Sequence, residues 1–202
     1  MEFYAGHTYH VYNQGNNKIN IFFEEENYLY FLSKMKYHLA PHAEILAWCL
    51  MPNHFHWLIK VKEEYENPES LDKSNKRIGV LNRSIGTLQS SYSQAINNKY
   101  NRSGSLFRTR TKAKSLSEDR DKRNFYGVNC FFYIHQNPLK AGLVQKMEDW
   151  PFSSFRDYAG MRGGDLCNKT LATDLFQLPD EPEKFYNVSL QTIPDYVIQK
   201  LF

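Results

Sequence analysis

The sequence has few cysteines and no long hydrophobic run. Among its 202 residues are three cysteines, Cys49, Cys130 and Cys167, an odd number spaced too widely for a disulfide framework or a C-x-x-C zinc site. The longest uncharged apolar run, Ile45 to Met51, is too short to span a bilayer, and the N-terminus lacks the basic start and apolar block of a secretion signal. We therefore expect a cytoplasmic protein, neither secreted nor embedded in a membrane.

Acidic residues are absent from a long central stretch. Between residues 73 and 114 the chain carries ten basic residues and no acidic one, whereas nine acidic residues oppose five basic ones from residue 148 to the end. A solvated surface carries many lysines too, but it usually mixes them with Asp and Glu, so the unmixed block favours a polyanionic partner, of which nucleic acid is the usual one. The basic residues are Lys73, Lys76, Arg77, Arg83, Lys99, Arg102, Arg108, Arg110, Lys112 and Lys114.

The length and the hydrophobic content of 42% predict one folded domain, residues 1–160, followed by a peripheral extension, residues 161–202. Alternating or helical spacing of apolar residues marks its elements, and Pro138 is expected to prevent regular continuation of the last helix. The expected strands are 9–14, 19–23, 44–51, 55–61 and 106–114, and the expected helices are 28–39, 78–96 and 118–137.

Two histidines stand one residue apart in an apolar, strand-like run. Side chains alternate between the two faces of a strand, so His54 and His56 are expected on one face while Phe55 and Trp57 lie on the other. Two imidazoles on one rigid surface provide two nitrogen ligands for a metal ion. They also suit the solvated face of an edge strand, because a pair of ligands is only half a site.

A second candidate group lies in the helix expected over residues 118–137. Tyr133 and Asn137 are four residues apart, which places them on the same side of that helix, one turn from each other. A tyrosine on a helix is more often half-buried core than a nucleophile. Phe125, Val128 and Phe132 are expected to form the apolar face of the helix, with Phe131 as a further candidate.

Basic side chains recur at every second position from Arg108 to Lys114. In an extended strand these four cations would share one face and form a positive row suited to phosphates, although a solvated edge strand protected by lysines looks similar. On the helix before them, Arg83, Gln89 and Asn97 are expected on the polar side, available to phosphate or water.

Taken together, these segments resemble the single-tyrosine HUH transposases, and among them the REP-associated tyrosine transposases. The resemblance extends over roughly residues 8 to 160 and rests on three runs that occur in one order. The runs are Leu50-Met51-Pro52-Asn53-His54-Phe55-His56, Tyr133-Ile134-His135-Gln136-Asn137-Pro138-Leu139-Lys140-Ala141-Gly142-Leu143-Val144 and Asp149-Trp150-Pro151-Phe152-Ser153-Ser154-Phe155.

This resemblance implies an α+β fold with a ferredoxin-like antiparallel sheet and helices packed on one face. It implies a metal-dependent single-stranded DNA endonuclease and strand transferase with Tyr133 as the nucleophile, His54, His56 and Asn137 as metal ligands, and a 5′-phosphotyrosine intermediate. Mg²⁺ or Mn²⁺ is the expected ion, although the ligand types alone would also admit Zn²⁺. Hairpin-containing single-stranded DNA is the expected partner, and a homodimer is compatible with the family. The DNA-binding residues expected from the basic block are Arg83, Arg102, Arg108, Arg110, Lys112 and Lys114.

Two other functions fit the same residues. One is a nucleic-acid binding protein on this fold whose chemistry is unused, such as a domesticated regulator. The other is a hydrolytic zinc enzyme, which is disfavoured because no acidic general base accompanies the histidines. Only the transposase hypothesis predicts a covalent protein–DNA adduct.

Overall fold

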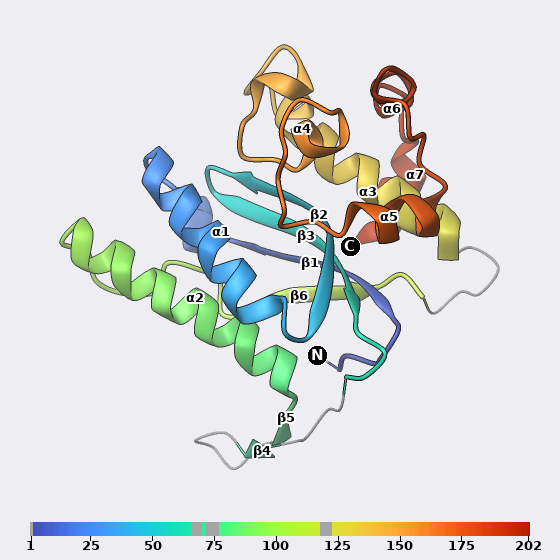
Figure 1. The fold of residues 1–202 in the computed structure, drawn as a ribbon. Coiled ribbons are helices and arrows are strands. Elements are labelled where there is room, and N and C mark those ends of the chain that lie inside the picture. Colours follow the sequence, from blue (N-terminus) through green and yellow to red (C-terminus); the bar gives the residue numbers. More distant parts are fainter. Residues whose placement is uncertain (1, 66–69, 72–76, 118–122) are drawn as a thin grey trace.

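A four-stranded antiparallel sheet forms the centre of the computed structural model, which describes residues 2–65, 70–71, 77–117 and 123–202 (Figure 1). The strands follow the spatial order β2-β3-β1-β6, the order of a ferredoxin-like βαββαβ unit, and the expected α+β class with this antiparallel sheet is confirmed. Helices pack on both faces of the sheet, however, and not on one face as expected. The four strands are β1 (Thr8–Gln14), β2 (Ala43–Met51), β3 (His54–Val61) and β6 (Lys112–Ser115), and a separate two-stranded ribbon consists of β4 (Ser70–Leu71) and β5 (Arg77–Ile78).

The first face of the sheet is apolar and covered by two helices. Phe55, Trp57 and Ile59 of β3 are fully buried on it, as their alternation with the histidines predicted. Packed against them are α1 (Glu25–Leu39) and α2 (Val80–Lys99), whose apolar residues recur at helical spacing (Figure 1). The strands predicted over 44–51 and 55–61 form an antiparallel hairpin, and the helices predicted over 28–39 and 78–96 are confirmed, with boundaries shifted by a few residues.

The second face carries α3 (Arg123–Lys140), which packs against β2, and the C-terminal helices that surround it (Figure 1). These helices are α5 (Lys169–Phe176), α6 (Pro182–Ser189) and α7 (Asp195–Ile198). They bury Phe176, Phe185 and Val197 in one apolar cluster with Phe131 and Ile134 of α3. The C-terminal helices thus contribute buried side chains to the core of this face and are not only peripheral, while the division into a domain over 1–160 and an extension over 161–202 stays a prediction.

The aromatic segment after α3 completes the exposed edge of β2. Phe152 O accepts a hydrogen bond from Leu50 N at 2.9 Å, and Ser154 N donates one to Trp48 O at 2.9 Å. The Phe152 ring also stacks on Tyr28 of α1 at 3.7 Å between centroids. This segment thus pairs with a strand that would otherwise offer unpaired backbone groups to solvent. It is framed by the 3-10 turn Met147–Asp149 and α4 (Phe155–Tyr158), and the other 3-10 turns are Asn16–Lys18 and Gln199–Leu201.

Two predicted boundaries are wrong. The strand expected over 106–114 begins only at Lys112, because residues 108–111 form a loop held by Asn13, whose side-chain amide donates to Arg108 O and Thr111 Oγ1. Pro138 does not end α3, which continues to Lys140. Pro138 lies in the last turn and has no N–H, so only the Ile134 carbonyl loses its helical hydrogen-bond donor. Residues 19–23, expected to be extended, form no strand.

Two side chains lie on the opposite side from that expected. Gln89 of α2 is buried, because its amide oxygen accepts from Asn13 Nδ2 at 2.8 Å and its Nε2 donates to Thr111 Oγ1 at 2.7 Å. Phe125 is 45% exposed at the start of α3, whereas Phe131 and Phe132 form its buried face. In both cases tertiary contacts, which local spacing does not encode, decide which side is inside.

Within the described residues, no helix combines the length and the hydrophobicity that crossing a bilayer would need. The sequence also predicts a linker over 62–76 and a capping box formed by Ser115 and Glu118; most of the linker, and Glu118, lie outside those residues.

Candidate active site

The two motif histidines lie side by side on the second face of the sheet. Their ring centroids are 5.0 Å apart and the ring planes are nearly perpendicular. Each ring has its Nδ1 in a hydrogen bond: His54 Nδ1 lies 2.6 Å from Asn53 Oδ1, and His56 Nδ1 lies 2.9 Å from His10 Nε2. The Nε2 atoms of both histidines are therefore the nitrogens left to bind a ligand.

Helix α3 brings Tyr133 to these histidines. The Tyr133 ring lies 5.7 Å from the His56 ring between centroids, edge to face, and the Lys140 Nζ lies 5.8 Å from the Tyr133 ring centroid. Asn137, one turn further along α3, is buried and donates its Nδ2 to Tyr133 O at 3.1 Å. Three of the four residues predicted to carry the chemistry, His54, His56 and Tyr133, thus meet in space although 77 positions separate His56 from Tyr133 in the chain.

These three side chains line an open pocket of about 250 Å³. Strand β1 contributes Tyr12, Asn13 and Gln14 to the wall, because Tyr12 pairs with His56 and Gln14 with His54 in the sheet. The C-terminal Phe202 closes one side, with its ring 5.5 Å from that of Tyr133. Asn137 is not among the residues that line this pocket.

Burial sets the protonation of the site. It lowers the pKa of His54 to about 4 and the pKa of His56 well below its ordinary value, an effect to which the neighbouring His10 and His54 add. Both imidazoles are therefore neutral at pH 7, the form that binds metals. Burial also raises the pKa of Tyr133, against a smaller opposing effect of a hydrogen bond from Asn137, so its hydroxyl is protonated at neutral pH.

The donor set is compatible with a divalent ion. Two neutral imidazoles that share one surface, each with its Nδ1 engaged, offer two Nε2 lone pairs to the same space. In the part of the chain that the structure describes, no group of three His, Cys, Asp or Glu side chains could hold a metal. A third protein ligand from that part would have to be an amide oxygen or another weaker donor, and ligands of these types admit Mg²⁺ or Mn²⁺ and also Zn²⁺.

The six predicted DNA-binding residues do not form one surface. Lys112 and Lys114 of β6 pair with Tyr12 and His10 of β1, so their exposed side chains lie on the same face of the sheet as the histidine pair. Arg83 is exposed on α2, which covers the other face. The remaining three lie in the loops before β6: Arg102, whose guanidinium stands 5.4 Å above the Phe23 ring, and the exposed Arg108 and Arg110.

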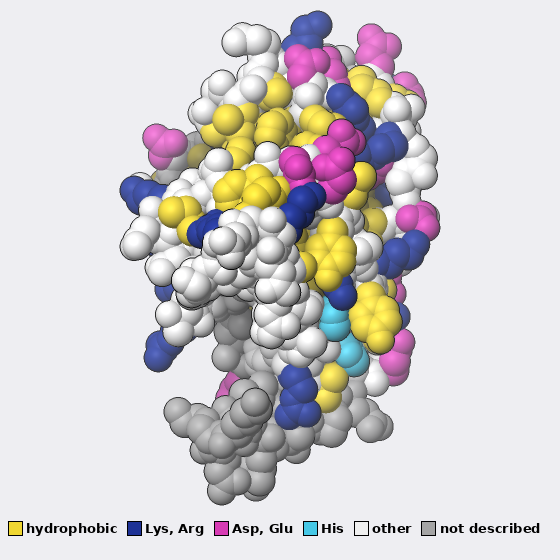
Figure 2. Space-filling model, turned by 90° about the vertical axis from the view of Figure 1, so that its left-hand side faces the viewer, with side chains coloured by type: hydrophobic (Ala, Val, Ile, Leu, Met, Phe, Trp, Pro, Cys, Tyr) yellow, Lys and Arg dark blue, Asp and Glu magenta, His cyan; other side chains and the backbone are white. Residues whose placement is uncertain are grey.

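Basic side chains are also dispersed at the end of the molecule that faces the viewer in Figure 2. They are spread over that face, and acidic side chains lie among them in its upper half, so this view shows no unmixed basic patch (Figure 2). The six residues predicted from the basic block are thus divided in space among a helix, the loop that follows it and a strand.

The sequence analysis missed four residues that line the pocket, Tyr12, Asn13, Gln14 and Phe202, and also His10, which lies behind the pocket in contact with His56. His10 and Tyr12 are two positions apart on β1, and this alternation with Tyr9 and Val11 was visible, but nothing local indicates that β1 pairs with the strand that carries the histidines. Phe202 reaches the site only because the C-terminal helices fold back over α3. No periodicity in that part of the chain predicted it.

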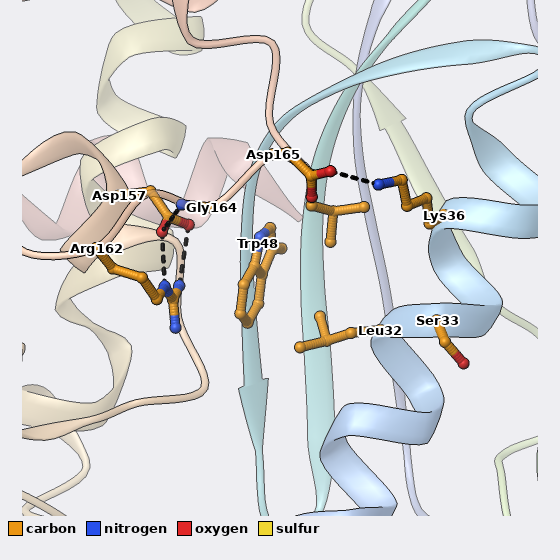
Figure 3. Close-up of a pocket in the computed structure, with 9 residues that line it drawn as sticks. Leu32, Ser33, Lys36, Trp48, Asp157, Arg162, Gly164 and Asp165 are labelled. Atoms are coloured by element: carbon orange, nitrogen blue, oxygen red, sulfur yellow. Dashed lines mark hydrogen bonds and ion pairs between the residues drawn. The ribbon is translucent and has the colours of Figure 1, made fainter.

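A second hollow, also of about 250 Å³, lies on the first face, beside β2 and α1 (Figure 3). Trp48 stands in its centre, between Leu32 of α1 and Arg162, which donates two hydrogen bonds to the buried Asp157 at 2.6 and 2.9 Å (Figure 3). A side chain at Gly164 would approach the Asp157 carboxylate to within 2.4 Å, so the loop needs glycine there. The ion pair anchors this loop against β2.

Comparison with known proteins gives one curated relative and a solved structure. No protein-family model matches the chain. A REP-associated tyrosine transposase of Haemophilus influenzae is 30% identical over 115 residues, which is 55% of this chain. A solved REP-associated tyrosine transposase bound to a REP hairpin matches with a TM-score of 0.57 and 20% identity, covering 83% of this chain and 92% of that one.

The two matches agree with each other and with the resemblance predicted from the motifs, which they confirm. The structural match supports the fold, and the sequence match supports the family. The aligned part corresponds to 58% of the length of the H. influenzae protein.

Proposed function

This chain is a relative of the REP-associated tyrosine transposases in sequence and in fold, and on that premise we propose that it is a metal-dependent endonuclease and strand transferase for single-stranded DNA. The observation that supports the proposal most is the meeting of Tyr133 with His54 and His56 in one pocket. A phenol beside two neutral imidazoles combines a nucleophile with ligands for a metal ion, the two parts that this chemistry needs.

In the proposed reaction Tyr133 is the nucleophile. Its oxygen forms a bond to the phosphorus of the scissile phosphodiester, the bond from phosphorus to the 3′ oxygen breaks, and the proton lost by the phenol ends on the departing 3′ hydroxyl by way of solvent. The products are a 5′-phosphotyrosine and a free 3′ hydroxyl. Because the covalent link keeps the energy of the phosphodiester, attack by a second 3′ hydroxyl reverses the step and joins strands.

The two histidines and Asn137 are the proposed ligands of Mg²⁺ or Mn²⁺. The ion would draw negative charge from the scissile phosphate and lower the cost of ionising a tyrosine whose pKa burial has raised. His54 and His56 stay neutral and fixed by their Nδ1 contacts, so they need no reorganisation to bind the ion. Asn137 would reach it from one turn along α3, and Gln14, which lines the pocket opposite His54, is the alternative amide.

The proposed substrate is a single strand that contains a hairpin, as in the REP hairpin bound by the related transposase. Lys112 and Lys114 share a face with the pocket, which suits them to hold phosphates on either side of the scissile bond. Arg83, Arg102, Arg108 and Arg110 remain proposed phosphate contacts at greater distances. The pocket is assembled from one chain; a homodimer stays a prediction that gel filtration with light scattering tests.

The test is formation of a covalent adduct. The protein is incubated with Mn²⁺ or Mg²⁺ and a panel of labelled hairpin oligonucleotides that includes the DNA flanking its own gene, and the products are separated under denaturing conditions. A labelled protein band that is lost in Tyr133→Phe supports the proposal, because this change removes one oxygen and leaves the ring to pack. Binding of the oligonucleotides without any covalent adduct contradicts the proposal.

A nucleic-acid binding protein with unused chemistry is the second candidate. Phe202 supports it, because its ring packs against Tyr133 and His56 in the pocket that the scissile phosphate would enter. This candidate predicts salt-dependent binding of the hairpin panel without any adduct, so the same experiment separates the two.

A further inference from the structure

His10 is a fully buried histidine in contact with the site, and the reaction proposed above gives it no role. It lies on β1, with Nδ1 2.9 Å from Leu201 O and Nε2 2.9 Å from His56 Nδ1. The ring centroids are 5.0 Å apart, close to the largest separation that a 2.9 Å contact between two ring nitrogens permits, so the contact lies close to both ring planes, as a hydrogen bond requires. Three segments remote in sequence, β1, β3 and the C-terminal turn, thus form one linear chain of contacts.

The direction of donation along these hydrogen bonds follows from the group at one end, the Leu201 carbonyl. The carbonyl of Leu201 can only accept, so His10 Nδ1 must carry the proton. A neutral His10 then has its lone pair on Nε2, which can only accept, so His56 must donate from Nδ1. The lone pair of His56 is consequently on Nε2.

We propose that His10 is a positioning residue that holds His56 in the Nδ1-protonated tautomer and so presents the Nε2 lone pair of His56 to the metal. The tautomer assignment rests on these contacts and on the burial that keeps His10 neutral, and only its link to metal binding rests on the function proposed above. Histidines that bind metals commonly have the second nitrogen fixed by a carboxylate or a backbone carbonyl. Here the Leu201 carbonyl fixes the tautomer of His10, and His10 in turn fixes the tautomer of His56.

The surroundings of His10 favour its neutral form. It packs among the rings of Tyr12, Tyr133 and Phe202, at 4.9, 6.3 and 5.3 Å between centroids. His10 is fully buried, and in the part of the chain that the structure describes neither of its ring nitrogens contacts a carboxylate that would stabilise a positive charge. A neutral relay also avoids placing a second positive charge beside a bound cation.

The other motif histidine reaches the same tautomer by a different contact. Asn53 Oδ1 accepts from His54 Nδ1 at 2.6 Å, and the orientation of this amide is consistent with its Nδ2 donating to Lys18 O at 3.4 Å. Both motif histidines therefore direct Nε2 to the pocket. A short local partner suffices for the part-exposed His54, whereas the buried His56 depends on a residue 46 positions away.

The first measurement uses the wild-type protein without metal or DNA. Long-range ¹H–¹⁵N correlation spectra of protein labelled with ¹⁵N-histidine identify the protonated nitrogen of each ring, and His56→Gln and His10→Gln assign the signals. The expected result is a protonated Nδ1 and an unprotonated Nε2 for both His10 and His56. A His56 ring protonated on Nε2 would overturn the proposal without any activity assay.

The second measurement compares two substitutions of His10 by titration with Mn²⁺ alone. His10→Gln keeps the polarity, because its amide donates to Leu201 O while its oxygen accepts from His56, so Mn²⁺ affinity should stay within about threefold of wild type. His10→Leu removes the acceptor, so the His56 signals should show mixed tautomers and Mn²⁺ affinity should fall by about 10- to 100-fold. Equal affinities for the Leu variant and wild type would overturn the proposal.

His135→Leu is the matched control for loss of a buried histidine. His135 is equally buried and has its Nε2 2.7 Å from Ser154 Oγ, but it does not line the pocket. This variant should lose stability while the His56 spectrum and Mn²⁺ affinity stay unchanged. The expected spectrum together with Mn²⁺ binding but no DNA adduct would contradict the proposed function and support the role of His10.

Discussion

The two faces of the sheet are built from the same strands but have different roles: the first provides packing, and the second carries the candidate active site. On the first face, β3 places Phe55, Trp57 and Ile59 under α1 and α2, where only packing is required. On the second face the alternate residues of β3 include His54 and His56, and the helices that cover this face leave a pocket over them. The comparison shows that alternate residues of one strand can serve either packing or the active site. A substitution on one face then leaves the side chains of the other face in place.

The largest effect is expected on the first face. Trp57→Ala removes a fully buried indole that stacks on Phe55 at 4.1 Å, so it should lower the free energy of unfolding by about 3–5 kcal/mol. Chemical denaturation measures this change. If the faces are separate, any Trp57→Ala protein that remains folded should keep the Mn²⁺ affinity of wild type; a parallel loss of both properties would contradict the separation.

Acid should destabilise the protein through the second face. Folding lowers the pKa of His10 from about 6.5 to about 4 and that of His135 to about 3, so the unfolded chain takes up protons first as the pH falls. Stability should therefore be constant above about pH 6.5 and decline towards pH 4, with His10 alone accounting for about 3 kcal/mol. Thermal denaturation between pH 8 and 4 measures it. In His135→Leu the decline should be shallower, and an identical slope would contradict the assignment.

The metal ligands should show a smaller and more specific effect. His56→Ala should weaken Mn²⁺ binding by about 10- to 100-fold. Activity should be partly restored at high Mn²⁺, because a site with fewer ligands still binds the ion, although weakly. Asn137→Ala should behave in the same way if its amide completes the metal shell. Titration calorimetry measures both, and Gln14→Ala is the informative comparison: normal metal dependence in Asn137→Ala with a loss in Gln14→Ala would transfer the ligand role to β1.

Single cations should give the smallest change. Lys112→Ala and Lys114→Ala, on the face of the pocket, should each weaken binding to any single-stranded sequence and reduce the salt slope by about one. Arg83→Ala, on the helix that covers the first face, is the matched control and should change the salt slope less than either lysine substitution. Fluorescence anisotropy at several salt concentrations measures the slopes. A larger effect for Arg83 would place the DNA on the helix side of the sheet.

Local patterns predicted much of this structure. Alternation gave the β2–β3 hairpin and the face of the two histidines, and a spacing of four placed Asn137 one turn beyond Tyr133. Both patterns depend on a period that each element imposes on its own residues. The pairing of His56 with Tyr133 came from the family resemblance, because nothing in the spacing shows that α3 packs on this strand.

The remaining features depend on contacts between remote segments. His10 meets His56 only through the register of β1 with β3, and Leu201 and Phe202 reach the pocket only after the C-terminal helices have packed on α3. The burial of Gln89 likewise requires its partners Asn13 and Thr111, which lie 76 and 22 positions away. Such positions carry no periodic signal, so a single sequence does not identify them.

The most direct test of the account locates the nucleotide on the protein. After reaction with Mn²⁺ and a cleavable hairpin oligonucleotide, the adduct is digested with nuclease and protease and the modified peptide is sequenced by mass spectrometry. The account predicts a nucleotide phosphate on Tyr133. Modification of Tyr12, which also lines the pocket, or of Tyr126, two turns earlier on α3, would contradict the assignment of Tyr133 as the nucleophile.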